Sequence, residues 1–116
     1  MRKILLADDD FTMVALLKTL LQMEGYETAS LMDKSGEILD NIRIERPDII
    51  LLDVYLGESN GVELVRQMRA VTDFKDIRII MVSGIDKSVE CLAAGADDFL
   101  LKPYMPGELF EKLKPV

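Results

Sequence analysis

The sequence predicts an α/β protein in which a parallel sheet is covered by helices on both faces. First, apolar runs such as residues 49–52 lack the polar alternation of a strand with one wet face. Second, these runs alternate with segments whose apolar residues recur at helical spacing. Third, 116 residues with 49% hydrophobic content suit a single core and are too few for two domains. Strand-then-helix units of this kind build a doubly wound, three-layer α/β/α sheet through right-handed crossovers.

The first part of the chain contains two of these units. Residues 4–7 predict a buried strand, and the following segment has the i, i+3, i+4, i+7, i+8 spacing of an amphipathic helix, with Gly25 at its C-terminal cap. Residues 26–31 predict a weaker strand, and a second helix around residues 38–42 ends before Pro47. The apolar positions of these helices are Met13, Leu16, Leu17, Leu20, Leu21, Ile38, Leu39 and Ile42.

The third unit begins with residues 49–53, where the unbroken apolar run predicts a central strand that ends at Asp53. A polar, glycine-bearing loop over residues 57–61 follows, in which Ser59 or Asn60 is available as a helix N-cap. The third helix has its inner face at Leu64, Val65 and Met68.

The last two units are shorter. Residues 77–82 predict a fourth strand that ends at Ser83, and the short helix after it is closed by Gly95. Residues 99–101 predict a fifth strand that ends at Lys102, and a final helix follows it. The fourth helix is indicated by Val89, Leu92 and Ala93, and the last by Leu109, Phe110 and Leu113 between Pro106 and Pro115.

Composition excludes several classes of function. The formal charge of -7, without a Lys/Arg-rich run, disfavours direct binding to nucleic acid. The chain has no histidine, which removes Ser-His and Cys-His catalysis and most zinc sites. Its one cysteine, Cys91, cannot form an internal disulfide and is predicted to be a small core side chain. We therefore expect a reducing, cytoplasmic location, with no signal peptide and no membrane-spanning segment.

Polar residues capable of phosphoryl chemistry follow four of the five predicted strands: Asp8 and Asp9, Asp53, Ser83, and Lys102. A parallel sheet brings the carboxyl ends of its strands to one edge, so these residues are expected to converge. Several carboxylates in one crevice repel each other unless a cation lies among them, and Mg²⁺ prefers such oxygen ligands. A lysine and a serine hydroxyl bind phosphate oxygens. The set predicts an aspartate that accepts a phosphoryl group.

Each of these residues also has an ordinary structural interpretation when it is taken alone. Asp53 suits a turn, Ser83 the end of a strand, and Lys102 a solvated surface, while Asp10 is predicted to be the N-cap of the first helix. The functional prediction depends on their order along successive strand ends.

Five segments together resemble the receiver domain of bacterial two-component response regulators. They are ILLADDD at 4–10, PDIILLD at 47–53, NGVEL at 60–64, VSG at 82–84 and AGADDFLLKP at 94–103. The resemblance covers essentially the whole chain, so residues 1–116 are expected to form one receiver domain. It implies a flavodoxin-like (βα)5 fold with strand order 2-1-3-4-5.

The resemblance also implies roles for the acidic residues. Asp53 would accept a phosphoryl group from the phosphohistidine of a sensor histidine kinase or phosphotransfer protein. Asp9, Asp53 and the backbone carbonyl of Tyr55 would bind Mg²⁺, with Mn²⁺ as an alternative, and Asp8 would act through a water molecule.

The resemblance further implies which residues respond to phosphorylation and which surface of the protein signals it. Lys102 and Ser83 would hold the phosphoryl oxygens, and Phe99 would move into space vacated by Ser83. The Lys102–Pro103 bond would be cis. A partner or output domain would read the face formed by the fourth helix, fifth strand and fifth helix, and a homodimer is one option for assembly. The protein would be a signalling domain rather than a turnover enzyme.

Three features depart from the family pattern or are particular to this chain. Gly57 stands where proline is usual, which predicts a looser loop after Asp53. The segment between Ser83 and Gly95 is shorter by about one helical turn, so the fourth helix or its leading loop is expected to be trimmed. Tyr55 and Ile85 lie two residues beyond Asp53 and Ser83, where their side chains are expected to screen an aspartyl phosphate from water.

Two other functions remain open at this point. A phosphatase of the haloacid-dehalogenase type would also form an aspartyl phosphate, but it carries a second acid two residues after the nucleophile, where this chain has Tyr55. A flavin-binding module uses the same fold, but the acidic strand ends would repel its phosphate.

Overall fold

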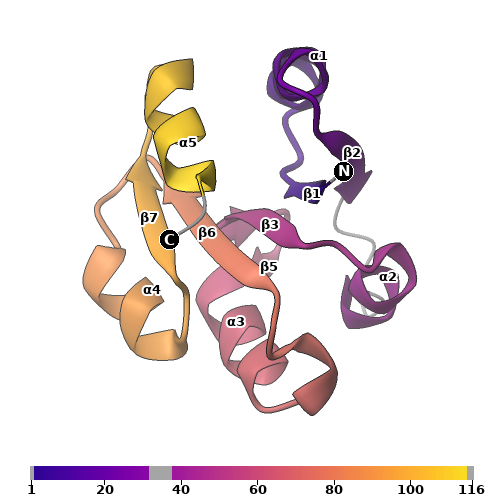
Figure 1. Ribbon diagram of the computed structural model, residues 1–116. Coiled ribbons are helices and arrows are strands. Elements are labelled where there is room, and N and C mark those ends of the chain that lie inside the picture. The colour runs from indigo at the N-terminus through magenta and orange to yellow at the C-terminus, as the bar shows by residue number, and fades with distance from the viewer. Residues whose placement is uncertain (1, 32–37, 115–116) are drawn as a thin grey trace.

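The computed structural model describes residues 2–31 and 38–114. Its middle layer is a five-stranded parallel sheet in the order β2-β1-β3-β6-β7 (Figure 1). Numbered among the strands of this sheet alone, the order is 2-1-3-4-5, which confirms the flavodoxin-like fold. The strands are β1 (Lys3–Ala7), β2 (Glu27–Leu31), β3 (Ile49–Asp53), β6 (Arg78–Ser83) and β7 (Asp98–Leu101).

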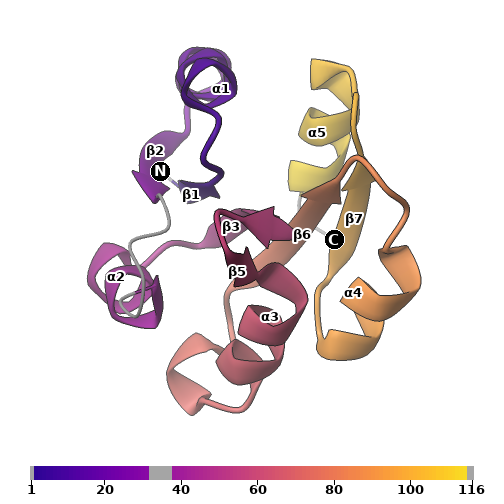
Figure 2. The same ribbon diagram turned by 180° about the vertical axis from the view of Figure 1, so that it is seen from behind.

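Helices cover both faces of the sheet. Figures 1 and 2 show α1 and α5 on one side and α2, α3 and α4 on the other. The two cores divide the β3 run between them, because Ile49 and Leu51 pack in the α1/α5 layer while Ile50 and Leu52 pack in the opposite layer. Burial on both faces explains the apolar run without alternation. The helices are α1 (Phe11–Met23), α2 (Ile38–Glu45), α3 (Gly61–Arg69), α4 (Ser88–Ala94) and α5 (Pro106–Leu113).

The strand register brings the carboxyl ends of four strands to the same edge of the sheet. Ala7 of β1 pairs with Leu52 of β3, Asp53 pairs with Val82 of β6, and Ser83 pairs with Leu101 of β7. The residues that follow these four strands therefore lie along the same edge of the sheet, as expected for parallel strands.

The rotation of α1 differs from the sequence prediction. Its buried residues are Val14, Leu17 and Leu21, whereas Leu16 is 53% exposed. About 200° of helical rotation separates Leu16 from Val14, so the two cannot both face the sheet. The predicted start is correct, because Asp10 caps the helix by accepting hydrogen bonds from Thr12 and Met13, and the predicted end is one residue late, because the C-cap is Glu24 and Gly25 follows it with φ 93°.

The short helix α4 is present, but its apolar residues are divided between core and solvent. Cys91 is buried, as predicted, together with Ala94, while Val89 and Leu92 are exposed. Gly95 ends the helix in the left-handed conformation. The stop predicted at Pro115 lies outside the described residues. Over the described ranges, no helix combines the length and apolar character needed to cross a bilayer.

Two small elements were not predicted. The polar segment after β3 forms an antiparallel pair of two-residue strands, β4 (Tyr55–Leu56) and β5 (Ser59–Asn60), with Gly57 at φ 56° in its turn. A 3-10 helix, η1 (Thr72–Phe74), connects α3 to β6. The paired strands β4 and β5 lie beside the carboxyl end of β3 and so shape the surroundings of Asp53.

Candidate functional site

Two buried carboxylates meet at one ammonium group at the carboxyl edge of the sheet. Lys102 Nζ lies 2.8 Å from Asp53 Oδ2 and 3.3 Å from Asp8 Oδ2. Asp53 and Asp8 are only 8% and 6% exposed, although they come from different strands. Their other oxygens accept backbone hydrogen bonds, Asp53 Oδ1 from the Tyr55 amide and Asp8 Oδ1 from the Asp10 amide. Each carboxylate is thus held in one orientation.

The charge of Lys102 is stabilised by this arrangement. Burial lowers the pKa of Lys102, but the hydrogen bond and charge of Asp53, together with the charge of Asp8, outweigh burial and raise that pKa above its ordinary value. Because the folded-state pKa is raised, the contribution of Lys102 to stability is fully present below the unfolded-state value of about 10.4 and is lost as pH rises through the folded-state value. Lys102 is therefore charged at neutral pH.

Asp9 occupies a different position from the other two acids. Its side chain is exposed, and its Oδ2 accepts a hydrogen bond of 3.0 Å from the Gly57 amide in the turn between β4 and β5. The three acids Asp8, Asp9 and Asp53 with the single cation Lys102 carry a formal charge of -2. This charge and an all-oxygen donor set fit a hard divalent cation such as Mg²⁺.

Binding of Mg²⁺ at this site does not require three acidic side chains to converge. Among residues 2–31 and 38–114, no three histidine, cysteine or acidic side chains are grouped to hold a metal ion. Mg²⁺ is commonly bound by one or two carboxylates, with waters completing the octahedron. The implied ligands, two carboxylates from Asp9 and Asp53 and the carbonyl of Tyr55, belong to that type of site.

Ser83 and Phe99 lie near this edge on β6 and β7. Ser83 is 1% exposed, and its Oγ accepts a hydrogen bond of 3.1 Å from the Ile85 amide. Its carbonyl accepts a hydrogen bond of 2.8 Å from the Lys102 amide, which ties the end of β6 to the backbone of Lys102. Phe99 pairs with Met81 and is half-buried against the core beneath α2, α3 and α4. The structure thus brings Asp8, Asp53 and Lys102 into direct contact, with Ser83 joined through the backbone.

Tyr104 is a neighbour of the site that the sequence did not single out. The Lys102–Pro103 peptide bond is cis, as the resemblance implied, and Tyr104 follows it, half-buried against the α1/α5 core. Burial is the main cause that raises the pKa of the Tyr104 phenol; the charge of Lys102 lowers it, and those of Asp8 and Asp53 raise it. Its position two residues after Lys102 was the only available signal.

Gly61 is a second feature that sequence reasoning did not assign to the site. Its amide donates a hydrogen bond of 2.6 Å to the Val54 carbonyl, and a Cβ at this position would lie 2.5 Å from the Asp53 carbonyl oxygen and 2.9 Å from that of Val54. Both are backbone atoms in a buried segment and cannot move aside easily. The glycine therefore allows α3 to begin against the backbone of Asp53.

Replacing Gly61 with alanine is expected to lower the free energy of unfolding by about 2–3 kcal/mol, because an overpacked methyl group must displace the backbone of Asp53 and Val54. Urea denaturation measures the change. Gly107→Ala is the control, since a Cβ there meets nothing within 4 Å and is expected to leave stability unchanged or slightly raised. Equal stability of Gly61→Ala and wild type would contradict the close approach.

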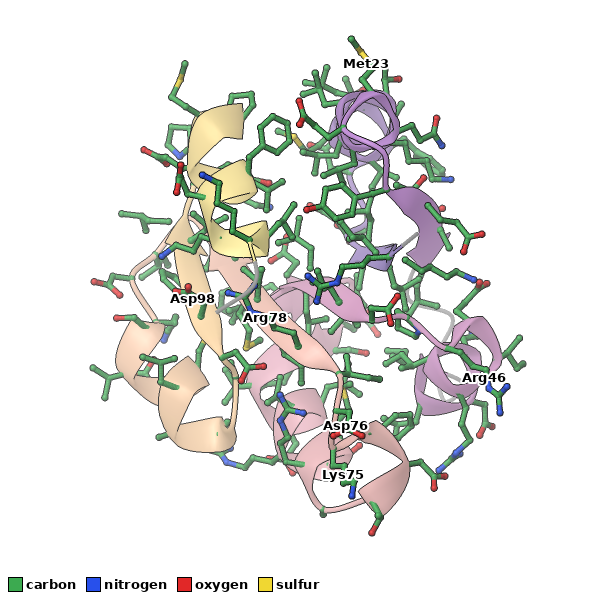
Figure 3. All side chains as sticks on the ribbon, in the orientation of Figure 1. Met23, Arg46, Lys75, Asp76, Arg78 and Asp98 are labelled. Atoms are coloured by element: carbon green, nitrogen blue, oxygen red, sulfur yellow. The ribbon has the colours of Figure 1, made fainter. Side chains whose placement is uncertain are left out.

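A cavity of about 990 Å³ lies away from these residues, between α2 and η1. It is lined by Arg46 and Asp76, which are labelled in Figure 3, and by the two residues just before β3, Pro47 and Asp48. This is the edge of the sheet opposite to Asp53. The convergence of charged groups, and not the size of a cavity, identifies the candidate site.

The chain is similar to known response regulators over nearly its whole length. The profile of the response regulator receiver domain family matches residues 4–114. The DNA-binding response regulator MtrA of Mycolicibacterium paratuberculosis is 34% identical over 116 residues, covering 97% of this chain and 50% of the relative. The chain thus spans about half the length of the curated relatives it matches.

Solved structures of response regulators and receiver domains have the same fold as this chain. The chemotaxis response regulator CheY4 of Vibrio cholerae superimposes with a TM-score of 0.87 at 31% identity, covering 97% of this chain and 96% of the other. The receiver domain of the sensor histidine kinase PA1611 from Pseudomonas aeruginosa, with a magnesium ion coordinated in its active-site cleft, has a TM-score of 0.81 at 27% identity, covering 96% and 93%. Together with the sheet order, these matches show that the chain belongs to the family of response regulator receiver domains of two-component signalling.

Proposed function

We propose that this receiver domain is a phosphoacceptor switch in which Asp53 receives a phosphoryl group from the phosphohistidine of a sensor histidine kinase or phosphotransfer protein. The observation that carries the proposal is the contact of one ammonium group, Lys102 Nζ, with the buried carboxylates of Asp53 and Asp8. A buried acid whose oxygen is already hydrogen-bonded to a cation is prepared for charge to build on a phosphoryl group attached to it.

The transfer would proceed in line at phosphorus. A carboxylate oxygen of Asp53 forms the new O–P bond, the P–N bond to the partner's imidazole breaks, and its electron pair returns to the imidazole ring. Lys102 stays charged and holds an oxygen of the incoming group, while the Ser83 hydroxyl donates to another after turning from its present contact with the Ile85 amide. The Tyr55 amide keeps the second Asp53 oxygen in place.

Mg²⁺ would be held by Asp9, Asp53 and the Tyr55 carbonyl, with Asp8 acting through water and with Mn²⁺ as an alternative ion. When bound, the ion supplies positive charge to the phosphoryl oxygens. The formal charge of -2 on the four charged side chains supports this assignment, as does the magnesium ion in the PA1611 receiver domain.

The phosphorylated state would be read at the face of α4, β7 and α5. Val89, Leu92, Leu101 and Met105 are exposed there, and Phe99 on β7 would link this face to Ser83. Because MtrA extends over about twice the matched length and is a DNA-binding response regulator, an output domain beyond residues 1–116, or a separate partner, would act on the signal. The receiver itself would bind no DNA and turn over no substrate, and it would work in the cytoplasm. Its assembly into a homodimer is one option.

Incubation with Mg²⁺ and acetyl phosphate tests the proposal against a phosphatase or a flavin protein. A receiver gains one acid-stable, base-labile phosphoryl group, seen as a single added mass on the intact chain. A phosphatase of the haloacid-dehalogenase type would release phosphate with repeated turnover, and a flavin module would be coloured and ignore the reagent. Either of the last two results contradicts the proposal.

The side chains of Tyr55 and Ile85 are expected to lengthen the lifetime of the phosphoryl-aspartate. Tyr55 and Ile85 are 52% and 62% exposed, and their amides bond to Asp53 and Ser83, so both side chains begin beside the phosphoryl position. We expect a long-lived phosphoryl-aspartate that decays about tenfold faster when both residues are changed to alanine, a difference of about 1.4 kcal/mol in barrier. Loss of radiolabel measures it. Val89→Ala, at an exposed position of α4, is the control, and rapid decay that the double variant leaves unchanged would disprove the screening role.

A further inference from the structure

The turn between β4 and β5 donates a hydrogen bond to a proposed metal ligand. The Gly57 amide lies 3.0 Å from Asp9 Oδ2, although 48 residues separate them in sequence. This is the position where the family pattern has proline, and proline has no amide hydrogen to donate. The contact is therefore a property of this chain's departure from the pattern.

The turn can present this amide only because of its backbone conformation. Gly57 has φ 56°, which proline cannot adopt and which most other residues adopt only with strain. Both sides of the turn are anchored, since Leu56 is fully buried and the Gly61 amide bonds to the Val54 carbonyl. The pairing of Tyr55 with Asn60 closes the hairpin. The looser loop expected from Gly57 is thus replaced by a paired turn with its amide directed at Asp9.

We propose that Gly57 is a positioning residue, whose amide holds one oxygen of the Asp9 carboxylate so that the other faces the site of Mg²⁺. This inference rests on the proposed function, because it assumes that Asp9 is a metal ligand. Asp9 is exposed, and without this hydrogen bond its side chain would sample several rotamers. All but one of these rotamers are lost when the ion binds, which costs conformational entropy. Hydrogen bonds from a second residue to a metal ligand orient that ligand, and their loss commonly weakens metal binding 10-fold to 100-fold, in round numbers.

The same hydrogen bond couples the hairpin to the ion in both directions. If a fixed Asp9 binds Mg²⁺ more tightly, then bound Mg²⁺ must by linkage favour the conformation in which the Gly57 amide is bonded. Exchange of that amide with solvent is therefore expected to slow when Mg²⁺ is added. It is expected to quicken about tenfold or more in metal-free Asp9→Ala, which has lost the acceptor.

Two substitutions at Gly57 test the turn, of which Gly57→Pro also gives up the φ of 56°, so the Asp9→Ala background is needed to isolate the hydrogen bond. Gly57→Pro removes the amide hydrogen, while Gly57→Asn keeps it and suits the left-handed conformation better than other non-glycine residues. We expect Mg²⁺ affinity, measured by calorimetry on the whole chain, to fall about tenfold in Gly57→Pro and to stay within about threefold of wild type in Gly57→Asn.

A double-variant cycle tests whether Gly57 acts through Asp9. In the Asp9→Ala background, Gly57→Pro is expected to have no further effect on Mg²⁺ affinity, because the partner of the amide is already gone. An equal effect of Gly57→Pro in both backgrounds would overturn the inference, and so would unchanged affinity in Gly57→Pro itself. If Gly57→Pro fails to fold, amide exchange in wild type and Asp9→Ala decides: equal Gly57 exchange in the two proteins overturns the inference. A wild-type chain that binds no Mg²⁺ at millimolar concentration would instead overturn the proposed function, and this inference with it.

Discussion

Changing Asp53 to asparagine is expected to abolish phosphorylation by acetyl phosphate in the presence of Mg²⁺, with no added mass on the intact chain. The amide side chain has no carboxylate oxygen to attack phosphorus, so the loss is complete and not partial. The fold is expected to persist, because the asparagine oxygen still accepts from the Tyr55 amide and Lys102 keeps its contact with Asp8. Intact-mass spectrometry and circular dichroism measure the two effects.

Asp48→Asn is the matched control. Asp48 immediately precedes β3, at the opposite end of the strand from Asp53, and is exposed, with its carboxylate accepting from the Lys3 amide. This variant is expected to gain the phosphoryl group as wild type does. A full adduct on Asp53→Asn, or loss of the adduct in Asp48→Asn, would contradict the assignment of Asp53 as the acceptor.

Changing Lys102 to alanine is expected to slow phosphorylation by about 100-fold to 1000-fold, the usual cost of losing one hydrogen-bond donor to a developing oxyanion. In metal-free buffer at pH 7 the free energy of unfolding is expected to fall by about 2 kcal/mol, because Asp8 and Asp53 remain buried with like charges. This is below the range for fully buried pairs, since the Lys102 side chain is 29% exposed. Mg²⁺ is expected to restore part of the loss.

A second, more exposed ion pair shows whether burial sets the size of that loss. Lys112→Ala is the control, because Lys112 also pairs with an acid at 2.9 Å, but both partners are about one-third exposed and such pairs contribute about 1 kcal/mol or less. Equal losses in the two variants would show that Lys102 has no special electrostatic role.

The sheet was predictable because the local signals agree with the global fold, whereas its strand order was implied by the resemblance to receiver domains. The run at Ile49–Asp53 is apolar on both faces, and only a strand covered by two helical layers buries such a run. Capping followed in part from local chemistry: Asp10 caps α1 as predicted, and of the two candidates Ser59 and Asn60 it is Asn60 that caps α3. The meeting of Asp8, Asp53 and Lys102 followed from strand polarity alone.

What the sequence did not predict depends on contacts between distant segments. The rotation of α1 that buries Val14 and exposes Leu16 is decided by packing on the sheet. The approach of Gly61 to the Asp53 backbone and the bond from Gly57 to Asp9 join residues whose local sequence carries no sign of each other. A glycine in a polar loop indicates only a turn, and its partner appears only once the chain is folded.

A crystal structure of the protein with Mg²⁺ and beryllofluoride tests the account most directly. We expect the fluoride adduct on an Asp53 oxygen, Lys102 Nζ in contact with one of its fluorines, and the ion between Asp9, Asp53 and the Tyr55 carbonyl. Beryllofluoride bound elsewhere, or an ion with no contact to Asp9 and Asp53, would show that the acidic edge of the sheet has another purpose.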